Sequence, residues 1–165
     1  MNADTFRELF RYHFSTNRKI WTQCVLPLTQ EQFLQETPYS VGSVRNQLVH
    51  MMDIDNIWFQ DIRGETFSGY VDSAQYSDRT HLRAEWDRVE ARMQSDLDAL
   101  QDQDLSRTIT IEDLNGGHST FRMWQGLIHV INHGTDHRAQ LLQLLNTLGC
   151  ETMSQDYADY FWKTT

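Results

Sequence analysis

The sequence predicts an all-α protein: a four-helix bundle with a small β-hairpin before the last long helix and a short C-terminal helix. Four long segments carry apolar residues at three- and four-residue steps, the spacing that gives a helix one buried face. Only two of the 165 residues are proline, so long helices can continue without interruption. Four amphipathic helices in a chain of this length are typical of a bundle, and we expect residues 1–165 to form one domain.

The first two helices are separated by a long connection that contains both prolines, Pro27 and Pro38. We expect the first helix from about Thr5 to Gln23, where aromatic and aliphatic residues recur at helical spacing. The second helix is expected to begin near Ser43, whose hydroxyl suits an N-cap, and to end at Arg63 before a glycine. The length of the connection predicts at least one long crossover in the bundle.

The third and fourth helices are expected over Asp78–Leu100 and from about Thr120 to Leu148, the latter closed by Gly149. Between them, residues 107–111 alternate polar and apolar side chains, as a half-buried strand does. The turn residues Asn115-Gly-Gly and the segment 118–121 complete a predicted β-hairpin. A short last helix is expected within Ser154–Trp162.

Composition narrows the class of protein. Twenty-three acidic and fourteen basic residues give a formal net charge of −9, which argues against a nucleic-acid-binding surface. No apolar run approaches the roughly 20 residues of a membrane span, and the N-terminus lacks the apolar segment of a signal peptide. Cys24 and Cys150 stand alone, so we expect two buried thiols and no disulfide framework. These observations predict a cytoplasmic protein that binds neither membranes nor nucleic acid.

The most informative motif is a run of three histidines, His129, His133 and His137, at four-residue intervals. Residues four apart stand one turn apart on the same helix face, where two imidazoles can bind one metal ion. The outer pair would be about 12 Å apart along the axis, too far for easy chelation of one ion. The site therefore uses His133 with one of its two neighbours.

Helical periodicity favours His137 as that neighbour. At 100° per residue, the buried stripe of the fourth helix is centred near Leu141. His137 lies about 40° from this centre, His133 about 80° and His129 about 120°. The first two border the buried stripe, so we expect His133 and His137 to be the ligands.

A catalytic metal site usually has three protein ligands, so a third histidine is expected. The candidates are His13, His50, His81 and His118. His50 lies on the shoulder of the buried stripe of its helix, where the histidines of a neighbouring helix could meet it, and it is preferred. His81 and His118 are expected to be solvated, and His13, on a hydrophobic face, is the reserve candidate.

Two polar residues, Gln47 and Asp55, fall inside the apolar stripe of the second helix, each about 40° from Met51. A buried carboxylate is costly unless it is paired. Both side chains could orient a ligand histidine or contact a substrate, or they could belong to a buried polar network. For Asp55 we favour a cap or an ion pair with Arg138, which also faces inward.

Three further residues are candidates for the wall of a substrate pocket. Trp58 lies two turns from His50, which sets it apart from tryptophans expected in the core. Arg138 and Gln140 directly follow the last histidine. Their alternative role is hydrogen bonding at the surface or between helices.

The segment His129–Gln140 and its leucine-rich continuation resemble the DinB/YfiT-like superfamily. His50, followed by Asp55 and Trp58 at five and eight residues, matches a second motif of that superfamily, with Asp where Glu is common. The resemblance implies a metal-binding four-helix bundle with His50, His133 and His137 as ligands to zinc or nickel. Ala139 and Asp136 depart from the usual residues and leave the substrate open.

The resemblance also implies candidate functions, because characterised relatives include thiol-dependent S-transferases and a mycothiol-dependent isomerase. The first hypothesis is a metal-dependent S-transferase or hydrolase that acts on a small-molecule substrate, with a low-molecular-weight thiol such as bacillithiol as cosubstrate. The second is a non-catalytic binding or scaffold module that contains the metal, and the third is a metal-free interaction domain. Relatives often form dimers, so a homodimer is expected.

Overall fold

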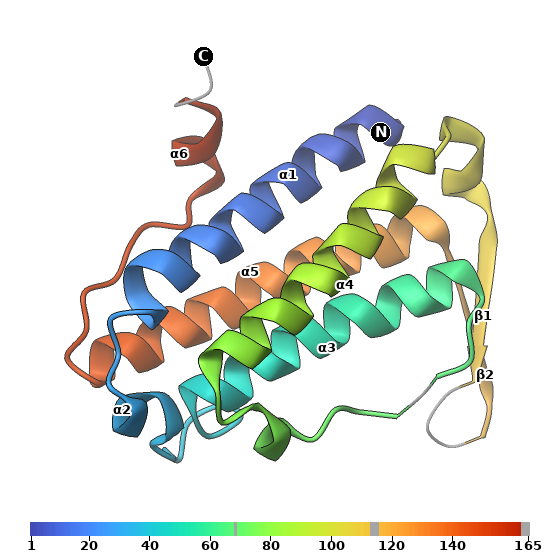
Figure 1. The fold of residues 1–165 in the computed structure, drawn as a ribbon. Helices are drawn as coiled ribbons and strands as arrows, with labels where there is room; N and C mark the ends of the chain where they lie inside the picture. The colour runs from blue at the N-terminus through green and yellow to red at the C-terminus, as the bar shows by residue number, and fades with distance from the viewer. Residues whose placement is uncertain (68, 113–115, 163–165) are drawn as a thin grey trace.

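Four long helices form the body of the protein, as the sequence predicts (Figure 1). The structure is a computed structural model and describes residues 1–67, 69–112 and 116–162. The four helices are α1 (Ala3–Ile20), α3 (Val44–Arg63), α4 (Arg79–Ala99) and α5 (Met123–Thr147). Their apolar faces meet in one continuous core that includes Phe6, Phe10, Phe59, Leu82, Met93 and Leu127.

The connection between α1 and α3 is more ordered than its two prolines suggest. The first helix continues past Ile20 as a π-helical turn, Trp21–Val25, so the helical path extends to the predicted end at Gln23 and slightly beyond it. A short helix, α2 (Gln30–Leu34), then follows, which the sequence analysis treated as part of a loop. Its N-cap is Thr29, whose hydroxyl accepts a hydrogen bond from the backbone N–H of Gln32 at 3.1 Å.

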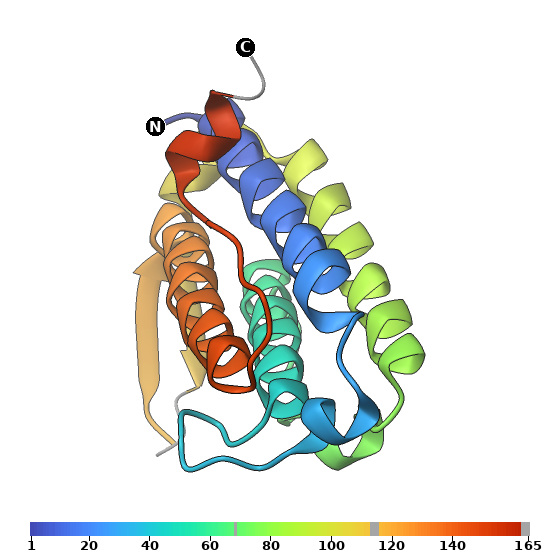
Figure 2. The same ribbon diagram turned by 90° about the vertical axis from the view of Figure 1, so that its left-hand side faces the viewer.

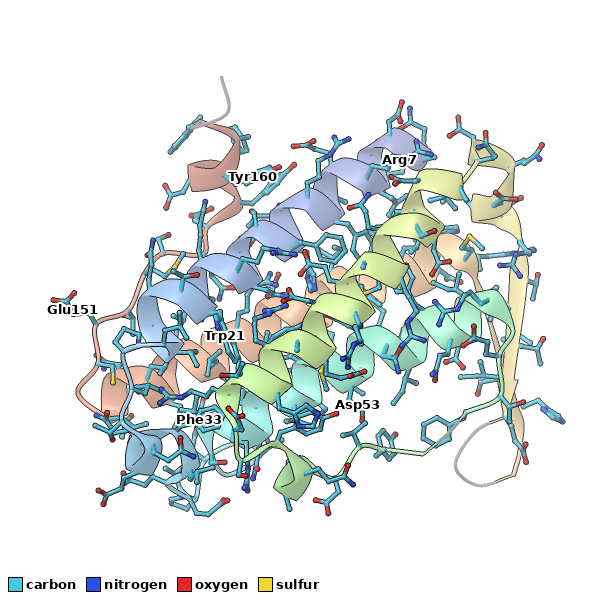
Figure 3. The ribbon with its side chains drawn as sticks, viewed as in Figure 1. Arg7, Trp21, Phe33, Asp53, Glu151 and Tyr160 are labelled. Atoms are coloured by element: carbon cyan, nitrogen blue, oxygen red, sulfur yellow. The ribbon has the colours of Figure 1, made fainter. Side chains whose placement is uncertain are left out.

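The bounds of α3 agree with those predicted. The hydroxyl of Ser43 accepts a hydrogen bond from the backbone N–H of Asn46 at 3.2 Å, which satisfies one of the open donors at the helix start. At the other end Gly64 adopts φ of 77°, a left-handed conformation that glycine takes without strain. Beyond it, the carboxylate of Asp53 accepts a hydrogen bond from the N–H of Val71 at 2.9 Å and holds the loop against α3 (Figure 3).

The predicted hairpin is present as β1 (Thr108–Glu112) and β2 (His118–Arg122), an antiparallel pair in which Ile109 faces Phe121. Its expected turn at Asn115 lies outside the described residues. Helix α5 begins at Met123 rather than Thr120, because Thr120 is paired with Thr110 in the hairpin. The helix ends as predicted, with Gly149 at φ of 77°.

Helices α3 and α5 lie side by side along most of their length, and α1 packs against α4 and α5 (Figure 1). After α5 the chain turns back and runs between α1 and α5 to the short helix α6 (Tyr157–Phe161), as Figure 2 shows. No helix among the described residues is long and apolar enough to cross a membrane. Of the two cysteines, Cys24 is buried as expected and Cys150 is partly exposed.

Candidate metal centre

The packing of α3 against α5 brings three histidines together, one from α3 and two from α5. Nε2 of His50 lies 3.2 Å from Nε2 of His133 and 3.3 Å from Nε2 of His137. The three candidate ligand atoms all lie within 4.8 Å of one another, and the side chains are half-buried. His133 and His137, the pair that periodicity favours, are thus joined by His50, the preferred third residue.

The spacing and chemistry of this cluster fit a transition-metal ion. Zinc binds imidazole nitrogen at about 2.0–2.1 Å, so two ligands at a tetrahedral angle are about 3.3 Å apart. Burial, followed by the nearby histidines, lowers the pKa of His133 to about 3. Burial also lowers the pKa of His50 and of His137. The three rings are therefore neutral at pH 7, the form in which imidazole binds a metal.

The second nitrogen of each α5 ligand has a different environment. Nδ1 of His133 is buried and has no hydrogen-bond partner among the described residues. Nδ1 of His137 lies 2.7 Å from the carboxamide nitrogen of Gln47, which also donates to the His137 carbonyl oxygen at 3.1 Å. A His137 that binds a metal ion through Nε2 carries its proton on Nδ1 and needs an acceptor there. The Gln47 carboxamide would present its oxygen to that proton by turning 180°. Gln47, predicted to orient a ligand histidine or contact a substrate, therefore contacts the candidate ligand His137.

Ser40, in the loop before α3, was missed by the sequence analysis. Its hydroxyl donates to the Gln47 carboxamide oxygen at 2.9 Å and also contacts the side-chain oxygen of Gln140. Ser40 has φ of 53°, a left-handed conformation that is uncommon for a residue other than glycine. Gln140, a predicted pocket residue, thus contributes to fixing this loop and donates to Asp136 at 3.1 Å. No sequence motif marks Ser40.

Trp58 is connected to the cluster through His129, whose ring lies 5.8 Å from that of His133, centroid to centroid. The Trp58 ring lies 4.2 Å from that of His129 and 5.1 Å from that of Phe121, centroid to centroid. Gly126 allows the Phe121 ring to pack here, because a Cβ at position 126 would lie 2.7 Å from that ring. His129, which periodicity disfavours, is exposed, and its ring packs against that of the tryptophan at an interplanar angle of 33° instead of joining the other three.

Comparison with known proteins agrees with this architecture. The model of the DinB family matches residues 1–165, the whole chain. The chain belongs to the DinB family. It is 25% identical to protein DinB of Bacillus subtilis (strain 168), over 98% of this chain and 96% of that protein. A crystal structure of a DinB-like protein from Bacillus cereus ATCC 10987 has the same fold, with a TM-score of 0.73 at 18% identity over 93% of this chain and 97% of that one.

Behind the histidine cluster, this DinB-family chain has a buried polar network centred on His13. The His13 ring is fully buried, and its Nε2 lies 3.1 Å from the Asp55 carboxylate while its Nδ1 lies 3.1 Å from the guanidinium of Arg138. Because an arginine only donates, Nδ1 accepts, while Nε2 faces both the Asp55 carboxylate at 3.1 Å and the side-chain nitrogen of Asn17 at 3.2 Å. His13 is therefore fully hydrogen-bonded within the protein and is not available as the reserve ligand.

The structure corrects the expected roles of Asp55 and Arg138. Among the described residues no direct ion pair joins them, because the His13 ring lies between the two charges. Both are buried, at 2% and 0% exposure, and neither lines an open pocket. The second alternative for Asp55, a buried polar network, is the one found.

The network also contains residues that sequence analysis of the DinB chain did not identify. The Arg138 guanidinium donates to the side-chain oxygens of Asn17 at 3.1 Å, Thr135 at 3.0 Å and Gln155 at 2.9 Å. One signal was available in Gly134, a glycine inside a long helix, which often marks close approach of another group. A Cβ there would lie 2.4 Å from Cε1 of His13.

Proposed function

We propose that this DinB-family protein binds one divalent metal ion, zinc or nickel, through His50, His133 and His137, and uses it in a thiol S-transfer or hydrolysis reaction. The observation that supports the proposal is the convergence of three neutral imidazole nitrogens, with 3.2 and 3.3 Å between neighbours. At most one N–H can lie between two such nitrogens, so at least one lone pair in the cluster has no donor from the other rings, and a metal ion can accept the lone pairs of all three.

The number of ligands supports an open site rather than a closed one. Among the described residues, these three histidines are the only group of histidine, cysteine or acidic side chains with metal-binding spacing. A structural zinc site normally has four protein ligands, whereas a catalytic one keeps a position for water or substrate. Three neutral ligands also leave the charge of the ion uncompensated, which favours an anionic hydroxide or thiolate at the open position.

The metal, when bound, would lower the pKa of a coordinated water or thiol and so supply the nucleophile near neutral pH. The protein's own residues hold and shape the site. Gln47 fixes the ring plane of His137, and Ser40 holds Gln47. Trp58 and His129 form an aromatic wall beside the cluster, and a flat or apolar part of a substrate would pack there.

The test is turnover of thiol by the metal-loaded protein. Zinc- and nickel-loaded samples are incubated with low-molecular-weight thiols, bacillithiol among them, and a panel of electrophiles, and loss of thiol is followed. We expect saturable consumption that disappears in His133→Ala. The matched control His118→Ala alters an exposed histidine of β2, outside both the cluster and the aromatic wall, and should retain metal-dependent consumption. An absence of saturable consumption across the panel would rule out the S-transferase.

A specific observation supports the alternative, a non-catalytic metal-containing binding or scaffold module. Five of the pockets formed by the described residues, with volumes of 280–560 Å³, have no histidine of the cluster in their lining. An enzyme for a small molecule usually has a concave site at its reactive centre. Metal binding without turnover, together with a fourth protein ligand in the metal-bound structure, would establish this alternative.

A further inference from the structure

The C-terminal segment, residues 151–162, is attached to the bundle at Gln155. Figure 2 shows the segment running between α1 and α5. The Gln155 side chain accepts a hydrogen bond from Nε of Arg138 at 2.9 Å and donates to the Thr135 carbonyl oxygen at 3.3 Å. Its backbone carbonyl accepts from the Tyr12 hydroxyl at 2.5 Å. One residue thus links the segment to both α1 and α5.

Arg138 depends on this link because all of its hydrogen-bond partners among the described residues are neutral. The side chain is 0% exposed, and its guanidinium donates to His13, Asn17, Thr135 and Gln155. A buried charge is tolerated only when its donors are satisfied. Of these four partners Gln155 alone comes from outside the long helices, and its departure leaves Nε of the guanidinium without an acceptor.

The segment has limited apolar anchorage, because Met153 packs against the core whereas α6 has no buried residue. The tyrosines of α6 pack on Tyr12 at ring distances of 5.0 Å for Tyr157 and 5.7 Å for Tyr160. Elements with few buried apolar contacts open more readily than the core of a protein. Docking of the segment is therefore an equilibrium that a modest change in the Arg138 network can shift.

The turn of α5 that Gln155 contacts is also the turn that carries two of the candidate ligands. Thr135 lies between His133 and His137, and Arg138 directly follows His137. Arg138 also holds the His13 ring against Gly134, the neighbour of His133. A displaced guanidinium would loosen this contact and, with it, the placement of both ligands.

We propose that Gln155 is a latch that couples docking of the C-terminal segment to metal binding at His133 and His137. The inference rests on the proposed metal site but not on any catalytic activity. Coupling between two sites is reciprocal, so metal binding strengthens docking by the same factor by which docking strengthens metal binding. Couplings of this kind typically amount to about 5–150-fold.

Amide hydrogen exchange of residues 151–162, measured with and without zinc, tests one side of the coupling. We expect zinc to slow exchange in the segment at least about fivefold in the unaltered protein. In Gln155→Leu this difference should disappear, and the zinc dissociation constant should rise by a similar factor. Gln155→Glu loses the donor to the Thr135 carbonyl oxygen but should still show exchange that depends on zinc, because its carboxylate accepts from the Arg138 guanidinium at least as well as a carboxamide does. A purely structural role for Gln155 would not make exchange depend on zinc.

The matched control is Glu151→Gln, which alters an exposed side chain of the same segment that projects away from the bundle (Figure 3). It should behave as the unaltered protein does. Zinc binding with unchanged exchange of the segment, or unchanged zinc affinity in Gln155→Leu, would overturn the latch while leaving the proposed function intact. A lack of zinc binding by the unaltered protein would overturn both.

Discussion

The histidines of this protein occupy two contrasting environments. His13 is fully buried, and each of its ring nitrogens contacts a charged side chain, Asp55 on one side and Arg138 on the other. His50 and His133 are half-buried, and their Nε2 atoms lie 3.2 Å apart and face each other rather than a charged side chain. The first arrangement satisfies the imidazole within the protein, whereas the second leaves its lone pairs for a ligand.

This difference shows why burial alone does not identify a metal ligand. His13 is the most buried histidine, yet its nitrogens are committed to a structural network. The half-buried histidines have lowered pKa values and one orphaned nitrogen, Nδ1 of His133, which a structural histidine would not retain. Substitutions in the two environments should therefore affect different properties of the protein.

The largest effect is expected for removal of one ligand. His50→Ala leaves two imidazoles on one helix and should weaken zinc binding by more than about 100-fold, beyond what loss of a supporting residue causes. Competition with a chromogenic chelator measures the dissociation constant. His129→Ala is the control and should bind zinc as the unaltered protein does. Equal loss in both variants would contradict the assignment of ligands.

The buried network should dominate stability instead. Arg138→Leu leaves Nδ1 of His13 without its donor. It also removes the positive charge on the side of the His13 ring opposite to Asp55, so the free energy of unfolding should fall by about 3–5 kcal/mol. Urea denaturation of metal-free protein measures this. Arg88→Leu, which removes an exposed arginine paired with Glu85, should cost less than about 1 kcal/mol. A similar small loss in both variants would show that the network is not a main source of stability.

A smaller effect on metal affinity is expected at Gln47. Gln47→Leu keeps the volume of the side chain but removes its contact with Nδ1 of His137, so zinc affinity should fall about 10–100-fold while three ligands remain. The same chelator competition measures it. Gln143→Leu, at an exposed position of α5, is the control. Unchanged affinity in Gln47→Leu would mean that packing alone orients the His137 ring.

The smallest effect is a pH dependence of the metal-free protein. The pKa of His133 is about 3 in the folded chain against 6.5 for an unperturbed histidine, so between these values the unfolded chain binds a proton that the folded chain excludes. Stability should be full above about pH 6.5 and should fall as the pH drops towards 3. Denaturation at pH 7 and pH 5 measures the slope of the free energy of unfolding against pH. This slope should be shallower in His133→Ala. An identical slope in that variant would place the pH dependence elsewhere.

Much of the fold could be predicted because helix caps and apolar periodicity are local. Ser43, Gly64 and Gly149 mark helix ends where the structure has them. His133 and His137 were identified because helical geometry fixes which side chains share a face. The short helix α2 was missed because five residues carry too little periodicity to distinguish it from a loop.

Contacts between distant segments could not be predicted in the same way. Ser40 lies in a loop, has a left-handed backbone conformation and donates a hydrogen bond to Gln47. Gln155 lies beyond the last long helix and accepts a hydrogen bond from Arg138. Neither position belongs to a periodic pattern. The expected ion pair of Asp55 with Arg138 was wrong. Helical angles give the direction of each side chain but not which residue lies between the two, and here the His13 ring does.

The central claim is that His50, His133 and His137 together hold one divalent ion. The most direct test is elemental analysis of tag-free protein, as purified and after incubation with zinc or nickel and removal of excess metal, beside His133→Ala treated identically. The account predicts about one ion per chain in the unaltered protein and a substoichiometric amount in the variant. No metal in the unaltered protein under either condition, or equal metal in both proteins, would contradict it.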